Sequence, residues 1–316
     1  MHDAPDAHRA AVRTRRRTTP LDRLAHPPRL AVRLGLAAAV AAVLVATILI
    51  TQPQPSASAS DVFGALRAPG ESAVIVGHRG DRARAPENTM PSLRLALDEF
   101  AFVETDVQLT RDGVPVLFHD VDLLRVAGDP HRVGELTLEQ LQRLDVGRRY
   151  DAAFDGTAIP TLDAFLAALA EREDARALIE LKAAWTPEEV EIVTRVVEHR
   201  GVRDRVVFES FSIETLDAIA QVAPIVPRIM LIRELPADPR PLAERFGLIG
   251  FGTTVASVTA QPAALTLAHD AGIAVLAYTL NSEKTWAEVA ALGVDGIITD
   301  RPSELDDWLA ATAPGT

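Results

Sequence analysis

The chain has 316 residues, which is enough for one large domain with appendages or for two ordinary domains. With 48% hydrophobic and 24% charged residues, it is neither disordered as a whole nor collagen-like, and the absence of cysteine excludes disulfides, thiolate metal sites and cysteine nucleophiles. Residues 1–50 carry eight Arg and three Asp, so the formal net charge of −12 is concentrated in the rest of the chain. Because phosphate backbones attract basic surfaces, this acidic main body argues against a nucleic-acid partner.

The N-terminal part of the sequence predicts a basic tail and a membrane anchor. Residues 1–33 are rich in Arg and Pro, which is typical of a disordered tail. The segment from Leu34 to Ile50 has seventeen residues without a charge. As a helix rising about 1.5 Å per residue it would cover about 26 Å, close to the thickness of a bilayer core. We therefore predict a transmembrane anchor at residues 34–51 and a linker rich in Pro, Ser and Ala at residues 52–72.

The charges around this segment predict its orientation. Arginines precede it and none follows closely, so the N-terminus is expected in the cytoplasm and the main body outside the membrane. Two alternatives remain open. A signal peptide cut among the small residues 56–60 would release a secreted protein, and the apolar segment could instead be a buried core helix.

The main body, residues 73–316, alternates short apolar, β-branched segments with amphipathic helical ones, as parallel sheets do. The expected strands are residues 73–77, 102–109, 177–181, 206–209, 228–232, 248–252, 273–278 and 296–298. The expected helices include residues 90–100, 161–172, 187–199, 213–222, 262–271, 283–292 and 303–311. Eight strands in about 250 residues match the size of a (β/α)8 TIM barrel. An open doubly wound sheet has the same local pattern, but no Gly-rich nucleotide-binding turn favours it.

One interruption of this alternation predicts an insertion. About forty residues, roughly 121–160, follow the second strand where a plain barrel would have only a loop, and residues 137–144 within them are expected to form a short helix. The insertion would lie at the end of the barrel where such enzymes build their sites.

Acidic residues alternate with apolar ones along two of the expected strands. Glu104 and Asp106 share one face of the second strand, and Glu180 shares a face of the third with Lys182. In a barrel the apolar faces meet the helices, so the three carboxylates point inward. They would repel one another unless a cation lies between them, and oxygen ligands favour Ca²⁺ or Mg²⁺. The alternative is an ion-pair network with Arg or Lys, or a position at exposed strand ends.

Two of the eight histidines stand where catalytic groups are expected. His78 follows the first strand and His119 ends the apolar run 114–118, each beside a charged neighbour, Arg79 and Asp120. Imidazole exchanges protons near neutral pH, which favours a role in acid–base catalysis. The alternative is that each is a hydrogen-bonded loop residue.

The order of these motifs resembles the glycerophosphodiester phosphodiesterase family over about residues 73–305. The matching stretches are His-Arg-Gly at 78–80, Pro-Glu-Asn-Thr at 86–89, Glu-Thr-Asp-Val at 104–107, His-Asp at 119–120, Glu-Leu-Lys at 180–182, Ser-Phe at 210–211, Tyr-Thr-Leu-Asn at 278–281 and the segment 293–302. The resemblance implies a (β/α)8 barrel with an inserted segment after the second strand. Tyr278 stands where many relatives have Trp.

The resemblance also implies an activity and roles for single residues. It implies metal-dependent hydrolysis of a small-molecule glycerophosphodiester to sn-glycerol 3-phosphate and an alcohol, through a cyclic phosphate. The implied roles are proton transfer for His78 and His119, binding of one divalent cation for Glu104, Asp106 and Glu180, and phosphate binding for Arg79 and Lys182. Glu87 and Asn88 have no evident role from the sequence, and Thr89 is placed to cap the helix that begins near Met90.

Two other functions remain open for a barrel with these motifs. One is a phospholipase D-like or phosphoinositide-cleaving enzyme that acts on lipids. The other is a catalytically inactive barrel that binds phosphodiesters.

Overall fold

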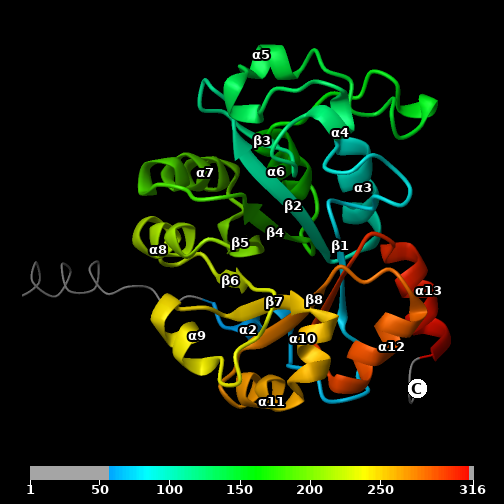
Figure 1. Cartoon of the computed structure of the whole chain (residues 1–316), viewed down its shortest axis with the longest axis vertical. Coiled ribbons are helices and arrows are strands. Elements are labelled where there is room, and N and C mark those ends of the chain that lie inside the picture. Colours follow the sequence, from blue (N-terminus) through cyan, green and yellow to red (C-terminus); the bar gives the residue numbers. More distant parts are fainter. Residues whose placement is uncertain (1–56, 313–316) are drawn as a thin grey trace, which may run out of the picture. The chain divides into compact units, whose positions relative to one another are not determined.

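Eight parallel strands close into a barrel in the computed structural model, which describes residues 57–312 (Figure 1). The barrel strands are β1 (Val74–Gly77), β2 (Phe102–Leu109), β4 (Arg176–Leu181), β5 (Val206–Ser210), β6 (Arg228–Leu231), β7 (Gly250–Thr254), β8 (Ala274–Tyr278) and β9 (Gly296–Thr299). Each strand pairs with the next, and β1 pairs with both β2 and β9, which closes the ring. The predicted parallel (β/α)8 barrel is confirmed.

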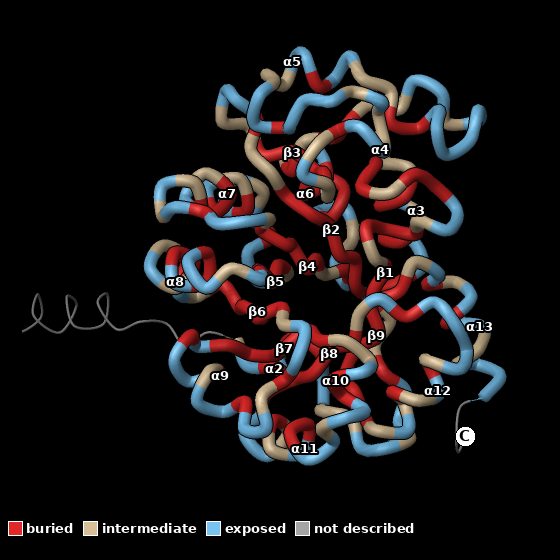
Figure 2. The backbone as a smooth tube through the Cα atoms, in the orientation of Figure 1, coloured by how far each residue is buried: buried red, intermediate tan, exposed pale blue. Residues whose placement is uncertain are grey.

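Helices alternate with the strands and surround them (Figure 1). The helices outside the barrel are α3 (Met90–Glu99), α6 (Leu162–Ala170), α7 (Pro187–Arg200), α8 (Ile213–Val222), α9 (Arg240–Phe246), α10 (Val255–Ala260), α11 (Pro262–Asp270), α12 (Glu283–Leu292) and α13 (Pro302–Thr312), with the short 3₁₀ turn η3 (Arg203–Arg205). Their exposed sides face outward while the strands between them are buried (Figure 2).

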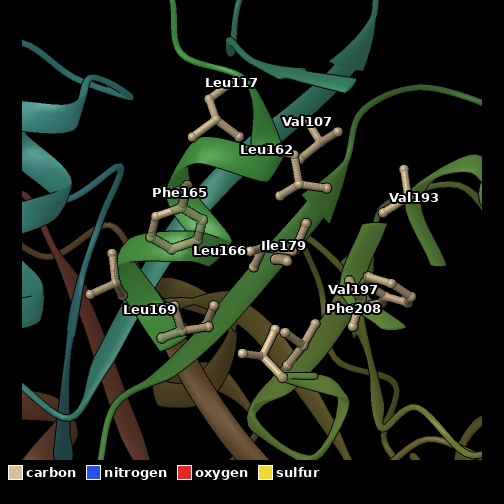
Figure 3. Packing of buried hydrophobic residues seen from close by; sticks show 14 of the residues in the cluster. Val107, Leu117, Leu162, Phe165, Leu166, Leu169, Ile179, Val193, Val197 and Phe208 are labelled. Atoms are coloured by element: carbon tan, nitrogen blue, oxygen red, sulfur yellow. The ribbon is translucent and has the colours of Figure 1, made fainter. Parts of the chain in front are cut away.

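The alternation of side chains along the strands separates two apolar layers. Val107 of β2, Ile179 of β4 and Phe208 of β5 point outward and pack on helix residues, among them Phe165 of α6 and Val193 of α7 (Figure 3). The next residues along these strands point into the barrel. Each strand therefore carries one face toward the helices and one toward the interior.

The interior is apolar at the N-terminal end of the strands. Phe102, Leu178 and Val207 lie there, and the short helix α2 (Ala59–Phe63) closes this end. The ring of Phe63 stacks on Phe102 with centroids 5.3 Å apart. Because this end is filled, the polar interior positions lie at the C-terminal end of the strands.

The segment that follows β2 contains the one strand between residues 57 and 312 that pairs antiparallel with a barrel strand. β3 (Pro115–Leu117) runs antiparallel to β2. Short α-helices and 3₁₀ helices then follow before α6: α4 (Leu124–Ala127), η1 (Val133–Glu135), α5 (Leu138–Leu141) and η2 (Ala152–Phe154). They enclose a small apolar cluster of their own, which includes Phe118, Val133 and Ile159.

One expected strand is shifted along the sequence in the structure. The strand expected at 248–252 begins at Gly250, because Leu248 completes the end of α9. Gly247 takes a left-handed backbone, and the Leu248 amide donates a hydrogen bond to the carbonyl of Ala243.

The tail predicted at residues 1–33 and the anchor predicted at 34–51 lie outside the described residues. Between residues 57 and 312, no helix is long and apolar enough to cross a membrane.

Candidate active site

His78 follows β1 and is held by an aspartate that follows β9. Its Nδ1 lies 2.6 Å from Oδ1 of Asp300, whose other oxygen accepts a 2.8 Å hydrogen bond from Asn281. Burial opposes ionisation of Asp300, but the hydrogen bond to His78 and the charge of Arg82 outweigh it and lower the pKa of Asp300 to about 2. Burial lowers the pKa of His78, outweighing the effect of Asp300. With Nδ1 occupied, Nε2 is the ring nitrogen left for proton exchange.

The turn after β1 has a left-handed backbone that brings Arg79 to two carboxylates. Arg79 and Gly80 have φ of 55° and 86°. A Cβ on Gly80 would lie 2.6 Å from the backbone carbonyl carbon of Ser92, so only glycine fits there. In this conformation the Arg79 amide donates to Oε2 of Glu104 at 2.8 Å. Its guanidinium Nε lies 3.3 Å from Oδ2 of Asp106.

Asn88 fixes the orientation of Asp106, a role that the sequence alone did not reveal. Its Nδ2 donates to Oδ2 of Asp106 at 2.8 Å, and its Oδ1 accepts from the hydroxyl of Thr105 and from the Asp106 amide. Asn88 holds a left-handed backbone, with φ of 52°, to reach them. The expected side-chain cap by Thr89 is wrong, because its hydroxyl donates to the carbonyl of Pro86 instead.

Three buried carboxylates meet at the C-terminal end of the barrel. Oxygens of Glu104, Asp106 and Glu180 lie within 4.8 Å of one another. Nζ of Lys182 lies 2.8 Å from Glu180 and 3.4 Å from Asp106. Burial and the charge of Asp106 raise the pKa of Glu104 well above its usual range and that of Glu180 to about 7. Burial acts in the same direction on Asp106, but the charges of Arg79 and Lys182 outweigh it and lower its pKa.

This donor set fits a hard divalent cation. All three groups are carboxylates, the ligands that Ca²⁺ and Mg²⁺ prefer. Burial, and then the charge of Asp106, disfavours the ionised forms of Glu104 and Glu180 despite the nearby Arg79 and Lys182. A bound cation among these oxygens would favour the ionised form of all three carboxylates.

His119 reaches the same cavity by a route that differs from the one expected. It follows β3, which runs back along β2, and the Phe118 amide donates to the carbonyl of Asp106. This pairing returns the chain to the level of the carboxylates, and β3 was not among the eight strands expected from the sequence. Nδ1 of His119 lies 2.8 Å from Asp120, and Gln108 donates to the carbonyl of Asp120. Burial lowers the pKa of His119 against the opposing charge of Asp106.

Glu87 connects the loops that carry the two histidines. Its carboxylate lies 2.8 Å from Arg79 and 2.6 Å from Arg125. Arg125 in turn pairs at 2.6 Å with Asp120, the partner of His119. Burial opposes ionisation of Glu87, but these arginines outweigh it and lower its pKa. Within the motif at residues 86–89, Glu87 therefore holds Arg79 and Arg125 in position, and Asn88 holds Asp106.

Six of the seven residues expected to carry the chemistry line one cavity. Its volume is about 220 Å³, and its charged and imidazole side chains are His78, Arg79, Glu104, His119, Glu180, Lys182 and Glu209. Asp106 is buried and pairs with Arg79 and Lys182 of this wall. The rest of the wall is Phe211, Leu231, Tyr278, Thr279 and Ile298. An outer groove of about 510 Å³ shares His119 and Lys182 with this cavity and extends past Trp185. The structure thus brings together all seven residues expected from the sequence.

Sequence reasoning missed Glu209, Asp300 and Asn88. Glu209 had the same signal as Glu104 and Glu180, an acid in an apolar strand on the face opposite Phe208. The contribution of Asp300 depends on β9 lying beside β1, which is a property of the closed barrel.

A closed (β/α)8 barrel with two aspartate-held histidines, a carboxylate cluster and two cationic side chains at its C-terminal end has the arrangement of a barrel enzyme that works by acid–base catalysis. Comparison with known proteins specifies the family. The family model described as "Glycerophosphoryl diester phosphodiesterase family" matches residues 78–304, so the chain belongs to that family of phosphoric diester hydrolases.

Individual relatives are similar along most of their length. A glycerophosphodiester phosphodiesterase of Bacillus altitudinis is 30% identical over 231 residues, which cover 72% of this chain and 94% of that protein. The structure of an Oleispira antarctica phosphodiesterase in complex with the product sn-glycerol-3-phosphate has a TM-score of 0.71 and 26% identity, and the match covers 75% of this chain and 96% of that one. A glycerophosphodiester phosphodiesterase from Agrobacterium tumefaciens has a TM-score of 0.66 and 30% identity, with 76% and 100% covered.

Proposed function

We propose that this enzyme hydrolyses glycerophosphodiesters to sn-glycerol 3-phosphate and an alcohol, with one divalent cation, Ca²⁺ or Mg²⁺, held by Glu104, Asp106 and Glu180. The observation that carries the proposal is the cavity in which both histidines, this carboxylate cluster and two cationic side chains face one another. The similarity to a phosphodiesterase bound to sn-glycerol-3-phosphate supports the substrate class.

The cationic groups prepare the substrate for attack. A phosphodiester anion resists nucleophiles, so its oxygens must be neutralised before a bond to phosphorus forms. Arg79 and Lys182 line the cavity and are placed to bind the phosphate. A divalent cation, when bound, supplies Lewis-acid polarisation of a phosphoryl oxygen. Asn88 and Glu87 hold Asp106 and Arg79 in these positions.

The two histidines move the protons. The 2-hydroxyl of the glycerol unit attacks phosphorus, and one imidazole accepts its proton at Nε2. The bond from phosphorus to the alcohol oxygen breaks, and the other imidazole donates a proton to that oxygen. Water then opens the cyclic phosphate with the roles of the two rings reversed. Asp300 and Asp120, on the Nδ1 atoms of His78 and His119, orient each ring and stabilise its charged form.

A lipid substrate is the second candidate, and exposed apolar residues favour it. Val121 and Phe211 are 70% and 47% exposed and line the outer groove and the inner cavity. These side chains could contact the acyl chains of a phospholipid. A catalytically inactive barrel is a third candidate, which the presence of the complete set of polar groups disfavours.

One assay separates the three candidates. The purified enzyme is incubated with glycerophosphocholine or with a two-chain phosphatidylcholine, with a chelator and with added Ca²⁺ or Mg²⁺. The proposal predicts cation-dependent release of sn-glycerol 3-phosphate from glycerophosphocholine and slower cleavage of the lipid. Faster cleavage of the lipid would favour the second candidate, and no turnover of any diester would favour the third.

We further propose that the enzyme is anchored in the cell membrane through residues 34–51, with the barrel on the extracytoplasmic side. The uncharged length of this segment and the arginines before it support this placement. Tagged full-length protein should fractionate with membranes, and protease added outside should digest the barrel but spare residues 1–33. A released form that begins near Ser60 would show instead that the segment is a cleaved signal peptide.

A further inference from the structure

Glu209 is a third acidic residue in the cavity wall, beside Glu104 and Glu180, and the mechanism above does not use it. It lies on β5 and is 1% exposed. Its Oε2 is buried, and no group within residues 57–312 donates a hydrogen bond to it. An isolated buried carboxylate oxygen is costly, so its retention in a functional cavity needs an explanation.

Its place in the barrel separates Glu209 from the cation cluster. Glu209 is in register with Glu180, which is in register with Asp106, so the three occupy neighbouring positions in one interior layer. The oxygens that lie within 4.8 Å of one another belong to Glu104, Asp106 and Glu180, and Glu209 is outside that set. Glu209 thus lies one strand beyond the cation cluster, a displacement of about 4.8 Å.

Glu209 also marks the boundary between the polar and the apolar parts of the cavity wall. On its other side its register partner on β6 is Ile229, and the cavity wall continues with Leu231 and Tyr278. The Tyr278 hydroxyl donates to the carbonyl of Ile232 and is therefore engaged elsewhere. Leu231 offers no donor. Among the described residues of this wall, nothing satisfies Oε2.

Because Oε2 is fully enclosed, a ligand reaches Glu209 through the carboxyl oxygen that lines the cavity, and a donor to that oxygen comes from the ligand. In the proposed function the phosphate binds Arg79 and Lys182, which line the cavity, and the three-carbon glycerol unit extends from it. Its terminal hydroxyl, the one farthest from phosphorus, is a donor and takes no part in the proposed chemistry. We propose that Glu209 accepts a hydrogen bond from this terminal hydroxyl and so makes the enzyme selective for glycerol over shorter or deoxygenated diols. This inference rests on the proposed function.

A pair of substrates tests the inference. Glycerophosphocholine is compared with the corresponding phosphocholine diester of propane-1,2-diol, which keeps the attacking 2-hydroxyl and lacks only the terminal one. The wild-type enzyme should prefer the glycerol compound in kcat/KM by about 10- to 100-fold, because leaving a buried acceptor without its hydrogen-bond partner has a cost of that size. The preference should fall to within about 3-fold in Glu209→Leu and take an intermediate value in Glu209→Gln, which keeps a neutral acceptor.

Glu214→Gln is the matched control. Glu214 lies on the first turn of α8, is exposed and is absent from the cavity wall, so this variant should keep the wild-type preference. If Glu209→Leu does not fold, as judged by circular dichroism, the isosteric Glu209→Gln decides the test. Equal losses on both substrates in the Glu209 variants, or no preference in the wild type, would overturn the inference. Failure of the wild type to cleave either compound would instead contradict the proposed function.

Discussion

His78 and His119 share one arrangement although they come from unrelated loops. In each case an aspartate lies against Nδ1, Asp300 for His78 and Asp120 for His119. A carboxylate in this position favours the tautomer with a proton on Nδ1 and leaves Nε2 free to accept a proton. This pairing of two oriented rings across one cavity is the residue-level basis for the proposed acid–base catalysis.

Replacing either ring should stop most of the turnover. His78→Ala and His119→Ala should each lower kcat by about 100-fold or more, because each removes a proton-transfer group. His131→Ala is the matched control and should keep the wild-type kcat. His131 also pairs with an aspartate through Nδ1, but it is exposed on the insertion. Steady-state kinetics on glycerophosphocholine measure the effect. Near-normal turnover in either of the first two variants would remove that histidine from the mechanism.

The cation site can be tested by direct binding. Asp106→Asn should weaken the binding of Ca²⁺ or Mg²⁺ by about 10-fold or more, because it removes a charged oxygen ligand from the centre of the cluster. Isothermal titration calorimetry measures the affinity independently of turnover. Asp112→Asn, an exposed substitution in the turn after β2, should bind the cation as the wild type does. Equal affinity in Asp106→Asn and wild type would show that the cluster does not bind the ion.

At the scale of single elements, the sequence predicted those parts of the site that depend on local alternation. Glu104 and Asp106 could be placed inside the barrel because apolar residues alternate with them along β2. His119 was predicted at the end of an apolar run, but its position at the cavity depends on the antiparallel pairing of β3 with β2, which returns the chain to Asp106 and was not predicted. The role of Asn88 depends on a tertiary contact and left no signal in the strand pattern.

The turn after β1 depends on a glycine, and this dependence can be measured. Gly80→Ala should lower the free energy of unfolding by about 2 kcal/mol or more and reduce activity, since the new Cβ would collide with the backbone of Ser92 and φ is 86°. Gly113→Ala is the control, because Gly113 has a similar φ of 77° but nothing within 4 Å of the new Cβ. Denaturant unfolding should show a clearly smaller loss for the control. An equal decrease in the free energy of unfolding in Gly80→Ala and Gly113→Ala would mean that the close contact of Gly80 with α3 does not affect stability.

At the scale of the whole molecule, closure of the barrel joins the two ends of the domain. Asp300 after β9 meets His78 after β1 because these strands are neighbours, although the residues are far apart in the sequence. The number of strands was predictable from the alternation of segments, but the contacts across the closure were not. These contacts join residues that are far apart in the sequence, so a pattern within a short segment cannot predict them.

This closure contact predicts how stability depends on pH. The pKa of Asp300 is about 2 in the folded protein and 3.8 when unperturbed. A lowered pKa stabilises the fold above the unfolded value, and this contribution, about 2 kcal/mol, is lost as the pH falls from about 4 toward 2. The melting temperature of Asp300→Asn should therefore fall less between pH 5 and pH 3 than that of the wild type. An equal fall in the melting temperature of the two proteins between pH 5 and pH 3 would contradict the ionised Asp300 contact.

The attacking group is the central claim of the proposed mechanism, and one comparison of substrates tests it most directly. In a phosphodiester of propane-1,3-diol the 2-hydroxyl is missing, while the phosphate can still bind Arg79, Lys182 and the cation. Because an intramolecular nucleophile has a high effective concentration, the mechanism predicts that this compound binds but turns over at least about 100-fold more slowly than the glycerol diester. Attack by water from the solvent or the cation predicts nearly equal rates. Comparable kcat values for the two compounds would contradict the cyclic-phosphate route.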